Sequence, residues 1–161
     1  MVFTGTFEHT IDTKNRLAIP SDMRAQLRRE TGQDNDLAMY VALGDGGALC
    51  LYSEQGFEKR AEQLDDSELD ADEILPYERL MYSLARRVEL DKQGRIRLPE
   101  NLRKMSKLPS DIVLIGVKDH IEVHNRETWM SHVEQMIADN PQMMMNPRRW
   151  RKRNGRGGAT D

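Results

Sequence analysis

Hydrophobic and polar positions divide the first 64 residues into six short segments. Apolar residues alternate with polar ones near the start, which predicts a strand. A proline then opens a helix, since the N–H that proline lacks is unpaired in the first helical turn anyway. Two apolar segments joined by Gly44–Gly47 predict a hairpin. The predicted elements are strands at 3–11, 17–19, 37–43 and 48–52, and helices from Pro20 and at 54–64.

The second half of the chain repeats this order, β, β, α, β, β, α. Four residues recur after 79 positions: Asp12 as Asp91, Arg16 as Arg95, Pro20 as Pro99 and Arg24 as Arg103. The closing parts, 49–64 and 121–136, align at a spacing of 72. The first copy therefore holds seven more residues than the second, and the turn segments 31–36 and 44–47 can accommodate them. Because these extra residues fall in turns and not in strands or helices, the repeat strongly indicates two copies of one structural unit. Its further elements are strands at 96–98, 112–117 and 120–124 and a helix at 126–138.

A connecting segment separates the copies. Residues 65–73 hold six acidic residues and predict a loop or a solvated helix start. Tyr77, Leu80, Met81 and Leu84 follow i, i+3, i+4, i+7 spacing, which predicts an amphipathic helix. The expected organisation is a first unit at 1–64, an acidic linker and connecting helix at 65–84, a second unit at 85–138, and a basic tail at 139–161 that we expect to be disordered.

Two five-residue turns, Asp12–Arg16 and Asp91–Arg95, carry the candidate chemistry. The leading Asp12 or Asp91 can accept hydrogen bonds from nearby backbone N–H groups and close its turn. Asn15 and Gly94 occupy the same slot, and both residue types tolerate positive φ. The slot is therefore expected to need a left-handed backbone.

A D-x-x-[GN]-R turn, a short apolar strand, then proline and an Arg-bearing helix resembles the SpoVT/AbrB fold. Two such copies, with VELDKQGRIRLP opening the second, resemble the MraZ family from Phe3 to about Ala138. The resemblance implies an α+β fold, in which two tandem swapped-hairpin units form an intramolecular pseudo-dimeric β-barrel with flanking helices. Asn15 departs from the glycine usual in the family, but it suits the same backbone conformation.

The same resemblance implies a function. It indicates a sequence-specific DNA-binding transcriptional regulator that assembles as a homo-oligomeric ring. Such a protein binds repeated short boxes in double-stranded DNA, upstream of the division and cell-wall gene cluster. It would be cytoplasmic and associated with the nucleoid.

Arg16 and Arg95 are the first candidates for DNA contact, since each follows a tight turn and can present a guanidinium to phosphate or to a guanine edge. The alternative is that each arginine pairs with its own turn aspartate and stabilises the loop. Both can hold, with the aspartate orienting the arginine. Lys14 and Lys92 are weaker candidates inside the turns. Arg97 is another, because it shares a strand face with Arg95.

The charge distribution restricts where DNA could bind. The net charge of −3 argues against a DNA binder, but residues 148–161 hold six Lys or Arg and one Asp, so the rest carries −8. A nucleic-acid surface must therefore be a local basic patch or the tail. The tail can either grip phosphates or act as a solubilising end. For Arg24 and Arg103 we favour a structural or inter-copy ion pair.

Other classes have little support in the sequence. No apolar run approaches a membrane helix, and no secretory signal is expected. The single Cys50 excludes an internal disulfide. His120 and His124 would lie about 13 Å apart along a strand, too far for one metal ion, so we expect no metal, no cofactor and no enzyme. Two alternatives stay open: an AbrB-like protein-binding module such as an antitoxin, and a hydrolase that uses the histidines.

Overall fold

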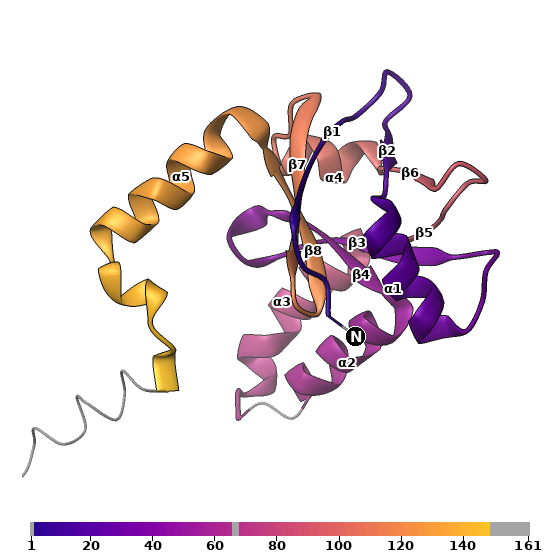
Figure 1. Ribbon diagram of the computed structural model, residues 1–161. Coiled ribbons are helices and arrows are strands. Elements are labelled where there is room, and N and C mark those ends of the chain that lie inside the picture. Colours follow the sequence, from indigo (N-terminus) through magenta and orange to yellow (C-terminus); the bar gives the residue numbers. More distant parts are fainter. Residues whose placement is uncertain (1, 66–67, 149–161) are drawn as a thin grey trace, which may run out of the picture. The chain divides into compact units, whose positions relative to one another are not determined.

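The computed structural model describes residues 2–65 and 68–148, which form a mixed α+β fold (Figure 1). The chain divides into two compact units, one up to Arg126 and one from Glu127 onward. The strands are β1 (Thr6–Thr10), β2 (Arg16–Ala18), β3 (Ala38–Leu43), β4 (Leu49–Ser53), β5 (Arg86–Glu89), β6 (Arg95–Arg97), β7 (Asp111–Val117) and β8 (His120–Asn125). The helices are α1 (Ser21–Thr31), α2 (Glu54–Asp65), α3 (Ala71–Leu84), α4 (Glu100–Met105) and α5 (Arg126–Asp139), with 3₁₀ turns η1 (Asp45–Gly47) and η2 (Pro141–Met144).

The predicted strands and helices are confirmed, with differences at their ends. The first strand begins only at Thr6, because Gly5 takes a φ of 93° and interrupts the extended chain. Phe3 nevertheless forms an isolated bridge with Lys118. The connecting helix α3 begins at Ala71, so the end of the acidic segment is a solvated helix start.

Antiparallel pairing joins strands of both copies into one six-stranded sheet, in the order β1-β7-β8-β4-β3-β5. The first strand of each copy pairs with the other copy: Thr6 of β1 lies opposite Ile115 of β7, and Val88 of β5 lies opposite Met39 of β3. At the centre, β4 of the first copy pairs with β8 of the second. The two copies therefore contribute alternating parts of a single sheet.

Strands β2 and β6 pair only with each other and form a separate two-stranded ribbon. The closed barrel that we expected is therefore not present among the described residues, where the six-stranded sheet is open and ends at β1 and β5. The physical reason is that β2 and β6 are three residues long and pair with each other, so β1 and β5 remain the edge strands of the sheet.

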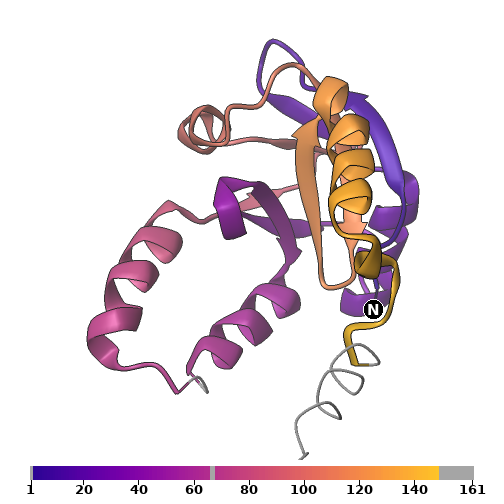
Figure 2. The same ribbon diagram turned by 90° about the vertical axis from the view of Figure 1, so that its left-hand side faces the viewer.

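The main core lies between the ribbon, the sheet and the helices that follow the prolines. Leu17 and Ile96 form the buried side of the ribbon, and Met23 of α1 and Leu102 of α4 belong to the same cluster. A smaller cluster covers part of the sheet's other face, where the ring of Phe57 from α2 stacks on Tyr40 with centroids 4.4 Å apart. Figure 2 shows α2 and α3 at an angle to each other, and Tyr82 of α3 meets Phe57 of α2 edge-on, with ring centroids 5.7 Å apart.

The second unit holds most of α5 and the turn η2. The indole of Trp129 lies beside the ring of His132, with centroids 6.0 Å apart. Within the segment 139–161, for which we expect disorder, Pro141–Met144 forms an exposed 3₁₀ turn. The remainder, 149–161, lies outside the described residues. Among the described helices, none has the length and apolar content needed to cross a membrane.

Candidate nucleic-acid interface

In the first turn, a single carboxylate holds the loop together. One oxygen of Asp12 accepts hydrogen bonds from the backbone N–H groups of Lys14 and Arg16, both at 2.9 Å. Its other oxygen accepts a bond from Nε of Arg16 at 2.6 Å. Asn15 has a φ of 59°, as the sequence predicted for this slot. The turn and the direction of the arginine are therefore fixed by one side chain.

The second turn repeats this geometry. Asp91 accepts hydrogen bonds from the backbone N–H groups of Gln93 at 2.9 Å and Arg95 at 3.0 Å, and from Nε of Arg95 at 2.9 Å. Gly94 has a φ of 76°. Each arginine thus pairs with its own aspartate through Nε. Within the described residues no partner bonds to the Nη groups of Arg16 or Arg95, whose side chains are 30% and 28% exposed.

The hydrogen bonds also fix the charge of the two aspartates. The backbone N–H of Arg16 is the largest cause that lowers the pKa of Asp12 to about 2, against a smaller opposing effect of burial. The same bond from the N–H of Arg95 is the largest cause that lowers the pKa of Asp91. Both carboxylates therefore stay ionised near neutral pH, where they orient the arginines by charge-assisted hydrogen bonds.

Each turn is also covered by the other copy. Arg103 of the second copy donates a hydrogen bond from Nη1 to Oδ1 of Asn15 in the first. In the reciprocal position, Arg24 lies so close to Gly94 that an added Cβ would be 2.6 Å from its Nη1. The inter-copy role expected for Arg103 is confirmed, but its partner is a neutral amide, so the expected ion pair was wrong.

The ribbon places three arginines on one face. Arg16 lies opposite Arg97 and Ala18 lies opposite Arg95, and residues directly opposite in a ladder point to the same side. Leu17 and Ile96 point to the other side and are buried. Positions 16 and 18 are about 7 Å apart along a strand. The two turns, at opposite ends of the ribbon, therefore offer their guanidinium groups on a common surface, which we call the arginine face (Arg16, Arg95 and Arg97).

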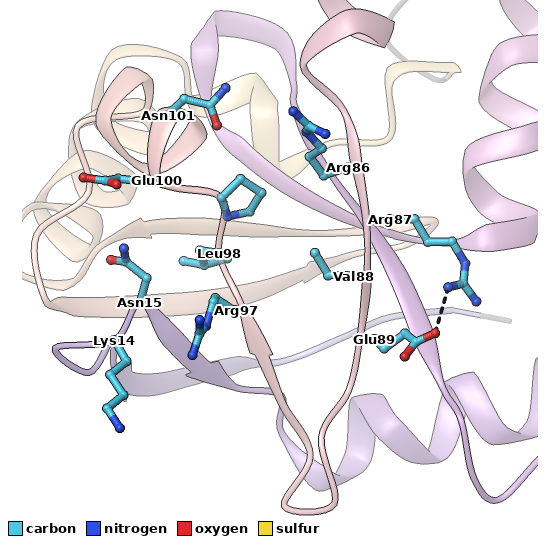
Figure 3. Close-up of a pocket in the computed structure, with 11 residues that line it drawn as sticks. Lys14, Asn15, Arg86, Arg87, Val88, Glu89, Arg97, Leu98, Glu100 and Asn101 are labelled. Carbon is cyan, nitrogen blue, oxygen red and sulfur yellow. Dashed lines mark hydrogen bonds and ion pairs between the residues drawn. The ribbon is translucent and has the colours of Figure 1, made fainter.

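An open depression of about 910 Å³ lies beside this face (Figure 3). Lys14 and Arg97 line it together with Arg86 and Arg87 of β5. Arg87 is paired with Glu54 and, at 3.2 Å, with Glu89, whereas Arg86 is exposed. Our sequence interpretation missed Arg86 and Arg87. Two consecutive arginines shortly before the turn Asp91–Arg95 could have indicated a basic surface near that turn.

Lys92, by contrast, does not join Lys14. It lines a separate depression of about 350 Å³ that also holds Asp34, Asp36 and Asp91. Its surroundings are therefore of mixed charge, whereas Lys14 lies in a mainly basic region. The five predicted DNA-contacting side chains therefore fall in three places: Arg16, Arg95 and Arg97 on the arginine face, Lys14 with Arg97 in the basic depression, and Lys92 in the depression of mixed charge.

The histidines show a different grouping from the one considered in the sequence. His120 and His124 both bond to the carboxylate of Glu122, each at 2.9 Å, because the three alternate along β8. Cys50 is the buried neighbour of this cluster. His9 lies on β1, separated from β8 by β7. The structure therefore does not join His9 to the cluster, which weakens the hydrolase alternative.

The fold and these turns define a tandem-repeat α+β protein whose two copies share strands and present matching Asp–Arg loops. A family model described as MraZ protein, antitoxin-like, matches residues 2–75 and 81–149. The chain belongs to the MraZ family. The second matched segment continues past Ala138, where our sequence resemblance ended, so the first part of the tail belongs to the family pattern.

Proposed function

We propose that this protein is a sequence-specific DNA-binding transcriptional regulator and that the arginine face contacts the DNA. The observation that carries the proposal is that Arg16, Arg95 and Arg97 share one side of a single ribbon. Two of them are held in place by aspartates through Nε. An oriented guanidinium loses less conformational freedom on binding and can form two parallel hydrogen bonds with phosphate or with a guanine edge.

The size of the ribbon supports insertion into the major groove. That groove is about 12 Å wide and admits a two-stranded β-ribbon, whose strands lie about 4.8 Å apart. The arginine face would then meet base edges. Lys14 and Arg86, in the adjoining depression, are placed to reach the phosphate backbone, which fixes the register of a protein on its site.

The proposal includes the fold details and the assembly implied by the family resemblance. The exchanged pairs β1–β7 and β3–β5 support a swapped-hairpin pseudo-dimer within one chain. Leu75 and Leu80 on α3 are 44% and 50% exposed, which supports a homo-oligomer that covers them. A ring would align several arginine faces, so that repeated boxes upstream of the division and cell-wall genes gain affinity through avidity. Such a regulator would be found with the nucleoid.

A mobility shift with the DNA immediately upstream of this protein's own gene tests the proposal. We expect binding that exceeds binding to scrambled DNA, rises with box number and falls steeply with salt. Arg16→Ala should weaken it by at least tenfold. Arg29→Ala removes an exposed guanidinium near the end of α1 and serves as the matched control. Equal losses in the two variants, or equal shifts with scrambled DNA, would refute specific binding by the arginine face.

A second candidate is a protein-binding module, which the antitoxin-like description of the family favours. In that case the chain should co-purify with a small protein in a fixed ratio. Arg16→Ala then shows whether the arginine face takes part in that complex, because loss of the small protein would place it on this face.

A further inference from the structure

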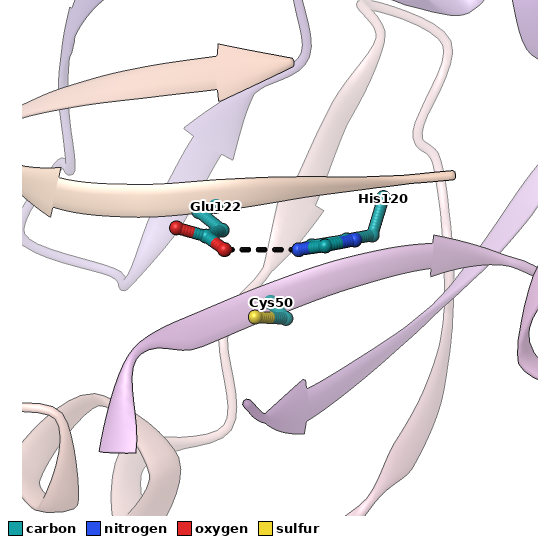
Figure 4. Close-up of side chains that lie close together, drawn as sticks. All are labelled: Cys50, His120 and Glu122. Atoms are coloured by element: carbon teal, nitrogen blue, oxygen red, sulfur yellow. Dashed lines mark hydrogen bonds and ion pairs between the residues drawn. The ribbon is translucent and has the colours of Figure 1, made fainter. Parts of the chain in front are cut away.

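Cys50, His120 and Glu122 bring a sulfur, an imidazole nitrogen and a carboxylate oxygen together at the centre of the six-stranded sheet. One ligand atom of each residue lies within 4.8 Å of the others. Cys50 lies directly opposite Glu122 in the β4–β8 pair, and His120 is two positions from Glu122, so all three share one sheet face. Figure 4 shows the bonded His120–Glu122 pair next to Cys50.

Two outer contacts hold these ligand atoms in place. Nδ1 of His120 lies 2.7 Å from Asp119, which leaves Nε2 facing Glu122 at 2.9 Å. The second oxygen of Glu122 lies 2.9 Å from Nε2 of His124. Histidines that bind metals commonly donate their other N–H to a carboxylate, and carboxylate ligands are commonly hydrogen-bonded in turn. The cluster therefore has the outer contacts of a metal site as well as its ligands.

We propose that Cys50, His120 and Glu122 form a binding site for a zinc-type divalent ion. The ligands would be Sγ of Cys50, Nε2 of His120 and a carboxylate oxygen of Glu122, with water in the fourth position. Sulfur and imidazole ligands select Zn²⁺ and related transition metals over Mg²⁺ and Ca²⁺, which take oxygen ligands. On binding, the thiol proton of Cys50 and the proton shared by His120 and Glu122 pass to water.

The spacing of the ligand atoms suits this ion. Bonds of about 2.0–2.3 Å to a tetrahedral Zn²⁺ place the ligand atoms about 3.3–3.7 Å apart. The 2.9 Å contact between His120 and Glu122 must open by only a few tenths of an ångström, and the remaining atoms lie within 4.8 Å.

The ion would link the two copies of the repeat. Cys50 is 1% exposed, whereas the side chains of His120 and Glu122 are 13% and 25% exposed, so the ion can enter from their side. Cys50 belongs to the first copy, and the other two ligands belong to the second. Since a ligand that binds only the folded state stabilises it, Zn²⁺ should strengthen the β4–β8 junction. This inference is independent of DNA binding.

Titration of the full chain with metal tests the proposal. The protein is first treated with a chelator, then titrated with Zn²⁺ alone by calorimetry and with Co²⁺ alone by absorption. We expect one ion per chain, a higher melting temperature with Zn²⁺, and a thiolate-to-cobalt charge-transfer band with Co²⁺. Cys50→Ser and Glu122→Gln should each weaken Zn²⁺ binding by at least tenfold, because each removes one ligand.

The control variant is His132→Ala, which removes an exposed imidazole on α5 and should leave Zn²⁺ binding unchanged. Equal affinity in the wild type, Cys50→Ser and Glu122→Gln would overturn the site. The spectrum of the wild type with Co²⁺ decides the matter without any variant, so the test survives a variant that fails to fold. A bound Co²⁺ without a thiolate band would exclude Cys50 as a ligand and overturn the proposal.

Discussion

The turns Asp12–Arg16 and Asp91–Arg95 share a hydrogen-bonding frame and differ in nearly everything else. In both, one carboxylate accepts two backbone N–H groups and the arginine Nε. Between aspartate and arginine the first turn has Thr-Lys-Asn and the second Lys-Gln-Gly. The comparison teaches that the loop geometry depends on the aspartate, the arginine and one residue that tolerates a positive φ, whereas the other two residues between them can differ between copies.

One of those differences is explained by the opposite copy. Asn15 receives a hydrogen bond from Arg103, whereas Gly94 lies against Arg24, which occupies the space that a side chain would need. A further difference lies after the turns, on the ribbon, where Ala18 of the first copy corresponds to Arg97 of the second. The second copy therefore supplies two of the three guanidinium groups of the arginine face.

The double variant Arg16→Ala/Arg95→Ala should have the largest effect on the proposed DNA binding. Each specific arginine contact contributes about 1–3 kcal/mol, so the loss of both should weaken binding by roughly a hundredfold or more. Titration of upstream and scrambled DNA measures this. If only one turn contacts DNA, the double variant will match one of the single variants, and the comparison of the two turns will have to be revised.

Gly94→Ala should have the next largest effect, on stability. A side chain at a φ of 76° costs about 1–2 kcal/mol, and its Cβ would meet the guanidinium of Arg24. Asn15→Ala is the matched change in the other turn, where alanine also takes a positive φ and the hydrogen bond from Arg103 is lost, but space for a side chain already exists. Urea unfolding of the two variants should show the greater loss of unfolding free energy for Gly94→Ala. The reverse order would show that Arg24 moves away easily.

Much of this site follows from the sequence because its causes are local. Asp12 bonds to residues two and four positions away, so a five-residue motif is enough to predict the turn, its positive φ and the arginine's direction. The repeat then predicts the second turn. What failed depends on long-range register. The barrel closure, the position of Arg86 beside Lys14, and the meeting of Cys50 with Glu122 are decided by strands far apart in the chain.

A smaller effect on DNA binding is expected for the two turn lysines, and it should be greater for Lys14 than for Lys92. Lys14 lies in the mainly basic depression with Arg86 and Arg97, whereas acidic and basic residues balance each other around Lys92. Lys14→Ala should weaken DNA binding a few-fold and reduce the salt dependence by about one unit of slope, as the loss of one phosphate contact does. Lys92→Ala should change both quantities less. A larger loss for Lys92→Ala in the same salt series would place the phosphate contacts on the second turn instead.

The smallest effect is a difference in acid stability between the wild type and Asp12→Asn. The pKa of Asp12 is lowered to about 2 in the folded protein, from an ordinary value of 3.8. A carboxyl with a lowered pKa stabilises the fold above its unfolded pKa, and this contribution is lost as the pH falls from about 4 to about 2. The wild type should therefore lose more unfolding free energy over that window than Asp12→Asn, which has no carboxyl at this position to protonate.

Asp91→Asn should differ from the wild type in the same direction, since the pKa of Asp91 is also lowered. Urea unfolding at several pH values measures these differences. Parallel curves for the wild type and both variants would mean that the folded turns are held by their backbone bonds without help from the ionised aspartates.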